Sequence, residues 1–401
     1  MDEAELLDRM RLVAEAFRPA APIDRRGLFS GRQDEIAELY SVIAQPGQHA
    51  VIYGERGVGK TSLAVVVAEL LRGSGILVAR ATCDSSDSFS TVWRKALSEL
   101  SFSHTKEAVG FGSATSESST PAAGLLGSGD VTPHAVQRAL GSIGEQQPIA
   151  VIFDEFDRLG AAEGKDRAIF ADTIKTLSDR VAPATIVIVG VADDVGELIR
   201  EHASVERALV QIRMPRMSRE ELAEIATKGV ESARMRIAKT SVSRITVLSQ
   251  GLPHYTHLLT QLAAQAALNE RRVDIAVRDV EAAVARAIER AQQSVTEAYY
   301  RATAGDGDAR RRVLLACALA DEDDFGFFSA TDLDEPLERL KGERDERPLE
   351  QDLLELAKTK AVLQRRKEAG TERYRFVNPL LQPYVVMRGL SEGLVKPRDV
   401  R

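Results

Sequence analysis

The run Gly54-Glu55-Arg56-Gly57-Val58-Gly59-Lys60-Thr61 has the residue types and spacing of a loop that binds phosphate. It fits G-x-x-x-x-G-K-[ST], follows a short apolar run at 49–53 and precedes a helical pattern that starts at Ser62. Glycines let backbone N–H groups wrap a phosphate chain, and a helix N-terminus adds positive potential. Because all fixed positions match in a strand-to-helix context, we expect residues 54–62 to bind a nucleoside triphosphate rather than form a chance glycine turn.

An acidic pair supplies the second group that triphosphate chemistry needs. Asp154 and Glu155 end the continuous apolar run 149–153, which is typical of a strand buried on both faces of a parallel sheet. We expect Lys60 to contact the β- and γ-phosphates, while the Thr61 hydroxyl and Asp154 hold Mg²⁺. Glu155 would orient and polarise the attacking water. The alternative is an ordinary surface Asp-Glu at a strand end.

Two further polar positions follow along the chain. The apolar run 185–191 predicts the next strand, which ends at Asp193, and a polar side chain there can sense the γ-phosphate or hold the water. Arg207 precedes another strand-like run at 210–214. It could act as an arginine finger that is supplied to a neighbouring subunit, although a solvated surface arginine is the plainer interpretation.

The elements that must position these residues alternate between strands and helices up to residue 216. This alternation predicts an α/β fold with a parallel sheet and ligands at the strands' carboxyl ends. We expect an N-terminal helix in 1–24, an ATPase core in 25–216 with a flexible, loop-like insertion at 101–132, a helical lid in 217–295 and a winged-helix domain in 305–401. After residue 218 the helical patterns continue without strands until two short strands near 361–367 and 373–378.

Composition limits the class of protein. The 401 residues carry a net charge of −7, with 44% hydrophobic and 28% charged residues, which is typical of a globular chain. The apolar runs are far shorter than the roughly 18 residues that a membrane helix needs. The acidic N-terminus and the isolated Cys83 and Cys317 predict a cytoplasmic protein without disulfides or membrane contact.

Taken together, these motifs resemble AAA+ ATPases of the group that joins replication-initiator ATPases with STAND signalling ATPases. Residues 28–35 resemble the group's F-x-G-R-x-x-E box, which implies that Gly31 and Arg32 lie beside the adenine. The 190–193 segment resembles the sensor-1 strand, and Ser204-x-x-Arg207 lies where the finger is often found. Residues 250–254 resemble the STAND lid motif, in which Pro253 packs over the nucleotide, and His254 takes the place of a sensor-2 arginine. The resemblance implies ATP and Mg²⁺ as cofactors.

Two tasks for such an ATPase remain open from the sequence. A DNA-associated initiator or regulator is favoured by local positive charge in the predicted wing, residues 358–375. The seven basic residues there are Lys358, Lys360, Arg365, Arg366, Lys367, Arg373 and Arg375, against Glu368 and Glu372. The alternative is a STAND-like nucleotide switch that regulates a separate effector protein in signalling or anti-phage defence. In either case the protein would assemble with itself as a ring or filament through the Arg207 edge.

Overall fold

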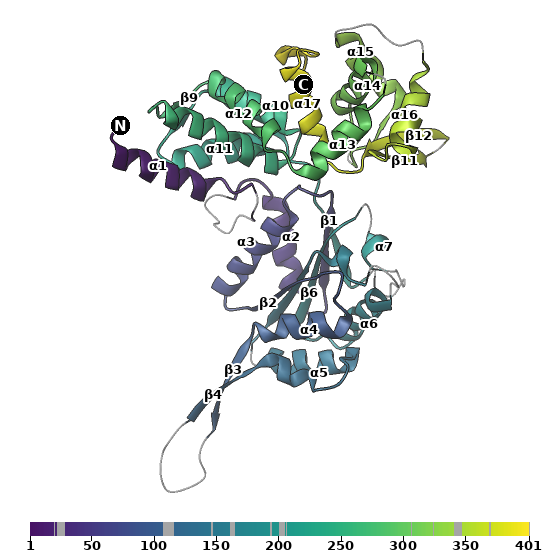
Figure 1. The fold of residues 1–401 in the computed structure, drawn as a ribbon. Coiled ribbons are helices and arrows are strands. Elements are labelled where there is room, and N and C mark those ends of the chain that lie inside the picture. The colour runs from purple at the N-terminus through teal and green to yellow at the C-terminus, as the bar shows by residue number, and fades with distance from the viewer. Residues whose placement is uncertain are drawn as a thin grey trace. The chain divides into compact units, whose positions relative to one another are not determined.

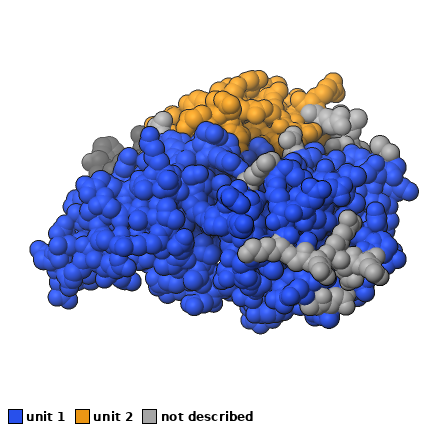
Figure 2. All heavy atoms as spheres, turned by 90° about the horizontal axis from the view of Figure 1, so that it is seen from above, with its two compact units in different colours: residues 1–31, 55–59, 215–401 blue, residues 32–54, 60–214 orange. Residues whose placement is uncertain are grey.

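The computed structural model describes two compact units of the chain (Figure 2). Unit 1 comprises residues 1–31, 55–59 and 215–401, and unit 2 comprises residues 32–54 and 60–214. The described residues are all except 20, 22–28, 107–115, 146, 161–164, 193–194, 200–204, 206, 306, 324, 341–346, 369 and 401. For residues 101–106, 116–120, 197 and 307 the backbone alone is described.

Unit 2 is built on a sheet of five parallel strands in the order β2-β5-β6-β1-β7. The strands are β1 His49–Gly54, β2 Leu77–Thr82, β5 Ile149–Asp154, β6 Ala184–Val191 and β7 Leu209–Arg213. Every residue of β5 is buried, as are the first seven of β6, because helices cover both faces of the sheet. The α/β fold class expected from the sequence is therefore confirmed.

Helices lie on opposite faces of this sheet because successive strands are first added toward one edge of the sheet and then back toward the other edge (Figure 1). From β1 the chain crosses to the edge strand β2, and it then returns through β5 and β6. Since parallel crossovers are right-handed, the reversal places α3 on one face and α4 to α6 on the other. The helices of unit 2 are α2 Gln33–Ile43, α3 Lys60–Gly73, α4 Phe89–Ser98, α5 Pro133–Gly144, α6 Lys165–Asp179 and α7 Val195–Leu198.

An aromatic cluster anchors the end of β5. Phe153 and Phe156 flank the acidic pair, are fully buried, and each lie 4.9 Å from the Phe170 ring, centroid to centroid. Trp93 packs edge-on to Phe153 at 4.8 Å and stacks on Phe170 at 5.9 Å. These rings come from α4, β5, α6 and the short 3₁₀ helix η3 Phe156–Arg158, so they join the sheet to its helical cover. The position of Asp154 therefore depends on this core.

The segment 101–132 differs from the loop expected from composition. Its described residues form an antiparallel hairpin of β3 Ser101–Lys106 and β4 Ser116–Pro121, followed by the 3₁₀ helix η2 Ala122–Leu126. Apolar periodicity could not reveal this hairpin, because its strands are rich in Ser and Thr and pair through backbone hydrogen bonds.

Unit 1 begins with α1 Glu3–Ala16, whose C-terminal neighbour Phe17 is fully buried. Four helices, here called the lid, follow residue 215: α9 Arg219–Ser232, α10 Lys239–Ser249, α11 Pro253–Asn269 and α12 Val277–Glu289. Ser218 and Glu221 form a capping box that starts α9. The expectation that strands stop at residue 218 was wrong for a two-residue pair, β8 Arg236–Ile237 with β9 Asp274–Ile275, which is too short for a periodic signal.

The remainder of unit 1, residues 293–400, is here called the C-terminal part. Its helices are α13 Gln293–Thr303, α14 Gly307–Leu319, η4 Ala330–Leu333, α15 Asp334–Arg339, α16 Leu349–Lys358, α17 Leu381–Ser391 and η5 Pro397–Asp399. A three-stranded antiparallel sheet has the order β10-β12-β11, with β10 Phe328–Ser329, β11 Leu363–Glu368 and β12 Thr371–Phe376. Helices with such a hairpin are the elements of a winged helix, and that assignment stays a prediction. Across the described residues, every helix is too short or too polar to cross a membrane.

Replacing Phe170 with Ala should lower the free energy of unfolding of unit 2 by about 3–5 kcal/mol, because it leaves a cavity at the centre of the aromatic cluster. Urea denaturation followed by fluorescence can test this, since Trp93 is the single tryptophan and lies in the cluster. Tyr40→Ala on α2, where the side chain is exposed, is the control and should change the midpoint little. Equal midpoints for the two variants would show that the cluster does not stabilise unit 2.

Candidate active site

The phosphate-binding loop has the backbone conformation that its glycines allow. Gly54, Gly57 and Gly59 have φ values of 147°, 92° and 99°, which residues with a Cβ rarely adopt. A Cβ on Gly54 would overlap the carbonyl oxygen of Met214. The loop therefore requires glycine at these positions for its turns and for the close approach of the chain after β7.

Three side chains gather where the loop enters α3, at the carboxyl end of the sheet. The Lys60 ammonium donates a hydrogen bond to the carbonyl oxygen of Gly54 at 2.9 Å, and Lys60 is buried. The Thr61 hydroxyl lies 3.3 Å from Oδ1 of Asp154, although 93 residues separate them. A hydroxyl beside a buried carboxylate next to a phosphate-binding loop is a suitable oxygen donor set for Mg²⁺. Thr61 and Asp154 are thus brought together as the metal hypothesis requires.

Burial raises the pKa of Asp154 above the ordinary value of an aspartate. Hydrogen bonds from the Glu155 N–H, at 2.9 Å, and from Thr61 oppose this shift. The carboxylate is therefore a costly negative charge when no cation is present, and a bound divalent cation would offset that cost.

Glu155 has a different environment from its neighbour. Its backbone is left-handed, with φ 51° and ψ 38°, so the chain turns and returns Phe156 to the core. Such a conformation costs a residue with a Cβ about 1–2 kcal/mol, and it points the Glu155 side chain outward at 48% exposure. The carboxylate pairs with Arg158 at 2.7 Å. Sequence reasoning missed Arg158, although its spacing of three from Glu155 was visible.

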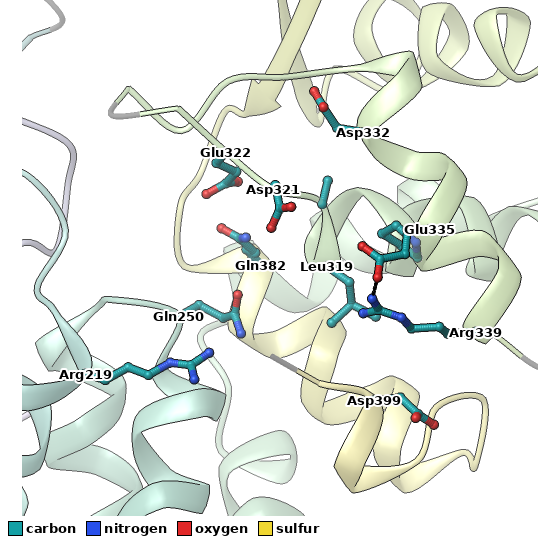
Figure 3. Close-up of a pocket in the computed structure, with 12 residues that line it drawn as sticks. Arg219, Gln250, Leu319, Asp321, Glu322, Asp332, Glu335, Arg339, Gln382 and Asp399 are labelled. Atoms are coloured by element: carbon teal, nitrogen blue, oxygen red, sulfur yellow. Dashed lines mark ion pairs between the residues drawn. The ribbon is translucent and has the colours of Figure 1, made fainter.

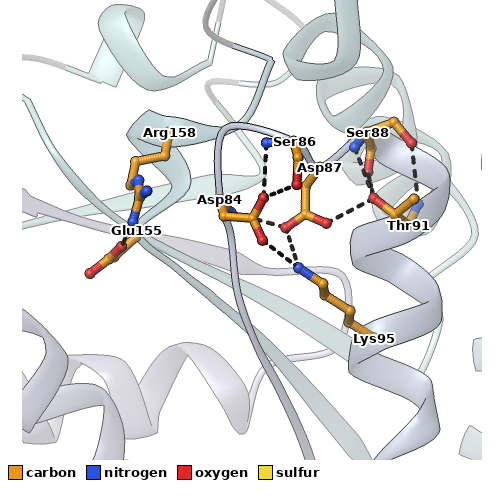
Figure 4. Close-up of polar contacts among 8 residues, drawn as sticks. All are labelled: Asp84, Ser86, Asp87, Ser88, Thr91, Lys95, Glu155 and Arg158. Atoms are coloured by element: carbon orange, nitrogen blue, oxygen red, sulfur yellow. Dashed lines mark hydrogen bonds and ion pairs between the residues drawn. The ribbon is translucent and has the colours of Figure 1, made fainter.

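A second group of charged and hydroxyl side chains lies on the loop that follows β2 and on the start of α4 (Figure 4). Lys95 pairs with Asp84 at 2.8 Å and with Asp87 at 2.6 Å. The pKa of Arg158 is raised, mainly by its hydrogen bond to Glu155, with smaller contributions from Asp84 and Asp157. Arg158 is therefore stabilised in its charged form by more than one carboxylate.

The end of β6 lies between the phosphate-loop strand β1 and the acidic strand β5. Its last residue, Val191, donates its N–H to Oδ1 of Asp157 at 2.8 Å, which ties β6 to the acidic segment. Asp157 thus has a positioning contact that sequence reasoning did not anticipate. Asp193 lies outside the described residues, so its role stays a prediction.

Within unit 1, the loop segment 55–59 lies close to the start of α11 and to the C-terminal part. A Cβ on Gly59 would lie 3.9 Å from the ring of Pro253, and one on Gly57 would lie 3.4 Å from a Leu380 methyl. The Tyr255 hydroxyl holds Leu380 through its carbonyl oxygen at 2.7 Å. Pro253 is therefore next to the loop that is expected to hold the phosphates.

The remaining candidate binding residues make contacts with the protein. Nδ1 of His254 lies 2.8 Å from the Pro19 carbonyl oxygen, and burial lowers the pKa of this histidine, so the neutral form is favoured. Gly31 donates its N–H to Glu224 at 3.2 Å. Arg32 is buried, has a left-handed backbone and pairs with Glu35 at 2.9 Å. An adenine contact of Gly31 or Arg32 stays a prediction.

Arg207 lies at the opposite end of the sheet from the phosphate-binding loop. It is exposed in the turn before β7, whose first residue, Leu209, pairs with His49 at the start of β1. The loop follows the end of β1 at Gly54, about 16 Å further along at 3.3 Å per residue. An arginine side chain cannot span that length, so Arg207 does not reach the loop of its own chain.

Much of the wing's positive charge is engaged inside the protein. Arg365 pairs with Glu372 at 2.5 Å, and Arg373 pairs with Asp323 at 3.1 Å. Arg375 donates to Gln364 and lies over the ring of Phe327, 4.7 Å from its centroid. The exposed cations of the wing that remain are Lys358, Arg366 and Lys367.

Comparison with solved structures finds distant likenesses over most of the chain. The ORC2 protein of Aeropyrum pernix, solved as ADPNP-ADP complexes, has 15% identity and a TM-score of 0.48, covering 95% of this chain and 98% of that chain. Cdc6p of Pyrobaculum aerophilum has 14% identity and a TM-score of 0.47, with the same coverage. RuvB of Thermotoga maritima, described as a Holliday junction branch migration motor, has 15% identity and a TM-score of 0.45, covering 86% and 92%. Among curated proteins, none matches this sequence.

The phosphate-binding loop, the acidic strand and the strand order β2-β5-β6-β1-β7 define a P-loop NTPase core of the AAA+ type. Residues 17–368 match the family described as novel STAND NTPase 1. The chain belongs to this family, which confirms the resemblance to STAND ATPases.

Asp154→Asn should stabilise the nucleotide-free protein at pH 7–8. Because the folded-state pKa of Asp154 is raised, the folded protein binds this proton more tightly than the unfolded chain does. Ionisation therefore costs stability above the folded pKa, and the advantage of the variant should shrink as the pH falls through that value. Thermal unfolding between pH 4 and 8 measures this, with the exposed Asp172→Asn on α6 as the control. A pH-independent difference would contradict the burial argument.

Proposed function

We propose that this protein binds and hydrolyses ATP with Mg²⁺ and acts as a nucleotide-controlled switch on a separate effector protein. The observation that carries the proposal is the convergence of Lys60, Thr61 and Asp154 at the carboxyl edge of the sheet, beside a glycine-rich loop. Mg²⁺ would neutralise charge on the phosphates, and Thr61 and Asp154 are the residues that would hold it.

Each residue of the cluster has a role that its present contacts support. Lys60 exchanges the Gly54 carbonyl for phosphate oxygens, which are stronger acceptors because they are charged. Glu155 would leave its ion pair with Arg158 and hydrogen-bond to the attacking water. The half-exposed, outward-facing side chain can make this change at small cost. Asp157 keeps the end of β6 beside the reacting atoms.

The switch part of the proposal rests on the contacts of loop segment 55–59 within unit 1. Leu252 and Pro253 of the lid and Leu380 of the C-terminal part all lie within 4 Å of a Cβ placed on Gly57 or Gly59. A loop that rearranges around phosphate changes these contacts, so nucleotide state can be transmitted to residues beyond the core.

A DNA-associated role is the second candidate. It rests on the exposed Lys358, Arg366 and Lys367, since the wing's other arginines are paired within the protein. DNA binding over a salt series separates the two functions, because phosphate contacts give a steep loss of affinity with rising salt. If the protein shows no affinity for DNA at low salt, with or without ATP, the nucleotide-controlled switch is the only one of the two functions that remains.

Lys60→Ala should weaken ATP binding roughly 10- to 100-fold, because a hydrogen bond to a charged group contributes about 1.5–3 kcal/mol. Glu155→Gln should bind ATP normally and lose turnover roughly 10²- to 10⁴-fold, because the amide cannot accept the proton of the attacking water. Calorimetric titration and steady-state phosphate release measure the two effects. Glu69→Gln, an exposed change on α3, is the control, and near-normal turnover of Glu155→Gln would sink the assignment of Glu155.

We further propose that hydrolysis is completed between subunits by Arg207. The residue borders β7, an edge strand of the sheet, and is too far from its own loop to act there. A head-to-tail assembly of identical chains presents one surface of each copy to a different surface of the next, so a finger from one copy can serve its neighbour.

Arg207→Ala should bind ATP almost normally and lose turnover by roughly 10³-fold or more, which is the usual effect of removing an arginine finger. Mixing Lys60→Ala with Arg207→Ala should restore part of the activity, because some interfaces then combine an intact loop with an intact arginine. Phosphate release from the mixture is compared with that of each variant alone. If the variants co-assemble and the mixture stays inactive, Arg207 does not act in trans.

A further inference from the structure

A largely buried ion-pair network within unit 1 joins the phosphate-binding loop to the C-terminal part. Nε of Arg216 donates to Glu55 at 2.9 Å, and Nη1 of the same guanidinium lies 2.8 Å from Glu322. Nη1 also donates to Oε1 of Gln382 at 2.6 Å. The side chains of Arg216, Glu55 and Glu322 are 20%, 14% and 12% exposed, so solvent screens these pairs weakly.

The four residues of this network belong to different parts of the chain. Glu55 is the second residue of the phosphate-binding loop, and Arg216 lies just before α9 of the lid. Glu322 follows α14, and Gln382 lies in the first turn of α17. One side chain therefore contacts both the nucleotide-binding loop and two elements of the C-terminal part.

Two glycines make room for the network. A Cβ on Gly251, where φ is 76°, would lie 2.7 Å from Cβ of Arg216. A Cβ on Gly326, where φ is 75°, would overlap the Glu55 carboxylate. Both positions have a left-handed backbone that favours glycine, so the local chain conformation and the ion-pair network are compatible with each other.

The charges of the network do not balance. Two carboxylates share one guanidinium, and burial raises the pKa of Glu322 to about 7 although Arg216 opposes the shift. Glu55 and Asp323 also raise it. Removing one partner from such a buried group is strongly unfavourable, whereas the intact group adds little net stability, because desolvation offsets the attraction. The contact can therefore hold two segments together and still be broken by a modest competing interaction.

A cavity of about 230 Å³ borders the network (Figure 3). Gln250 and Arg219 of the lid region line it together with Glu322 and Gln382 of the C-terminal part. The packing between lid and C-terminal part is thus incomplete next to the ion pairs, so separation there gives up less apolar contact than a filled interface would.

We propose that Arg216 is a coupling residue, and that the Glu55–Arg216–Glu322 bridge holds the C-terminal part on the phosphate-binding loop until nucleotide binds. This inference rests on the proposed function and names the contact that regulates it. An anionic phosphate chain on residues 57–61 repels the nearby Glu55 carboxylate and repositions the loop, which weakens the bridge. Because coupling is reciprocal, breaking the bridge at its far end strengthens nucleotide binding by the same factor.

Glu322→Ala, which breaks the bridge at the end away from the phosphates, is the main test, run at pH 8, above the raised pKa of Glu322. In nucleotide-free protein it should raise backbone hydrogen exchange in α14, α17 and residues 55–59. It should also tighten binding of ATP with Mg²⁺ by roughly 5- to 150-fold, the usual range of a coupling between two sites. Asp321→Ala removes the adjacent, exposed carboxylate of the same cavity and should change neither quantity.

A double variant tests whether the two glutamates act through one arginine. Glu55→Ala with Glu322→Ala should raise exchange no more than the stronger single variant, because either change breaks the same bridge. Additive effects, or an exchange pattern for Glu322→Ala that equals that of Asp321→Ala, would overturn the coupling role of Arg216. Circular dichroism confirms that each variant is folded.

The outcomes separate this inference from the proposed function. If the wild-type protein binds ATP and Glu322→Ala changes neither hydrogen exchange nor ATP affinity, the coupling role of the bridge is refuted, but the proposed ATP-binding function is not. If Glu322→Ala raises exchange but neither protein binds ATP, the proposed function fails, and the nucleotide coupling fails with it. Repeating the exchange measurement in the Lys60→Ala background should reproduce the effect of Glu322→Ala, because the bridge exists without nucleotide.

Discussion

The contact between the Thr61 hydroxyl and the Asp154 carboxylate, 3.3 Å long, is the constraint on which the candidate site in unit 2 depends. Asp154 is the last residue of β5, and Thr61 lies beyond the end of β1; these two strands are not neighbours, because β6 lies between them. Strands two places apart in a sheet are roughly 10 Å apart, so the start of α3 has to bring Thr61 toward β5 for this contact to form. The register of three strands and the aromatic cluster under β5 keep that edge in place.

Adjacent carboxylates acquire different properties from a single backbone turn. Asp154 completes a fully buried strand, whereas the left-handed conformation of Glu155 ends that strand and turns its side chain toward Arg158 and solvent. The buried carboxylate favours a bound cation because its own charge is poorly solvated. The exposed one can change partners at small cost, since an exposed ion pair contributes only about 0–1 kcal/mol. Two roles thus follow from two environments of one Asp-Glu pair.

The phosphate-binding loop has a second set of contacts, which explains how a small ligand could affect a large part of this chain. Leu252, Pro253 and Leu380 lie close to Gly57 and Gly59 of this loop, and Glu55 reaches the C-terminal part through Arg216. Apolar contacts and a buried ion pair respond differently to phosphate, because only the ion pair is directly sensitive to the added negative charge. These two kinds of contact on one loop are the basis of the nucleotide-controlled switch that we propose.

The sequence by itself determined the local features: the phosphate-binding loop, the buried strand before Asp154 and the helical character of the chain that follows residue 218. Glycine spacing and apolar periodicity report backbone geometry directly, so these features needed no tertiary information. The Ser/Thr-rich hairpin β3–β4 was missed because backbone pairing leaves no apolar pattern. Only the tertiary structure decided that Arg207 would lie at the far end of the sheet and that Arg216 would join Glu55 to Glu322. Glu55 and Arg216 are 161 positions apart in the sequence. An ion pair between such distant residues depends on how whole elements pack, and no local pattern of residues encodes that packing.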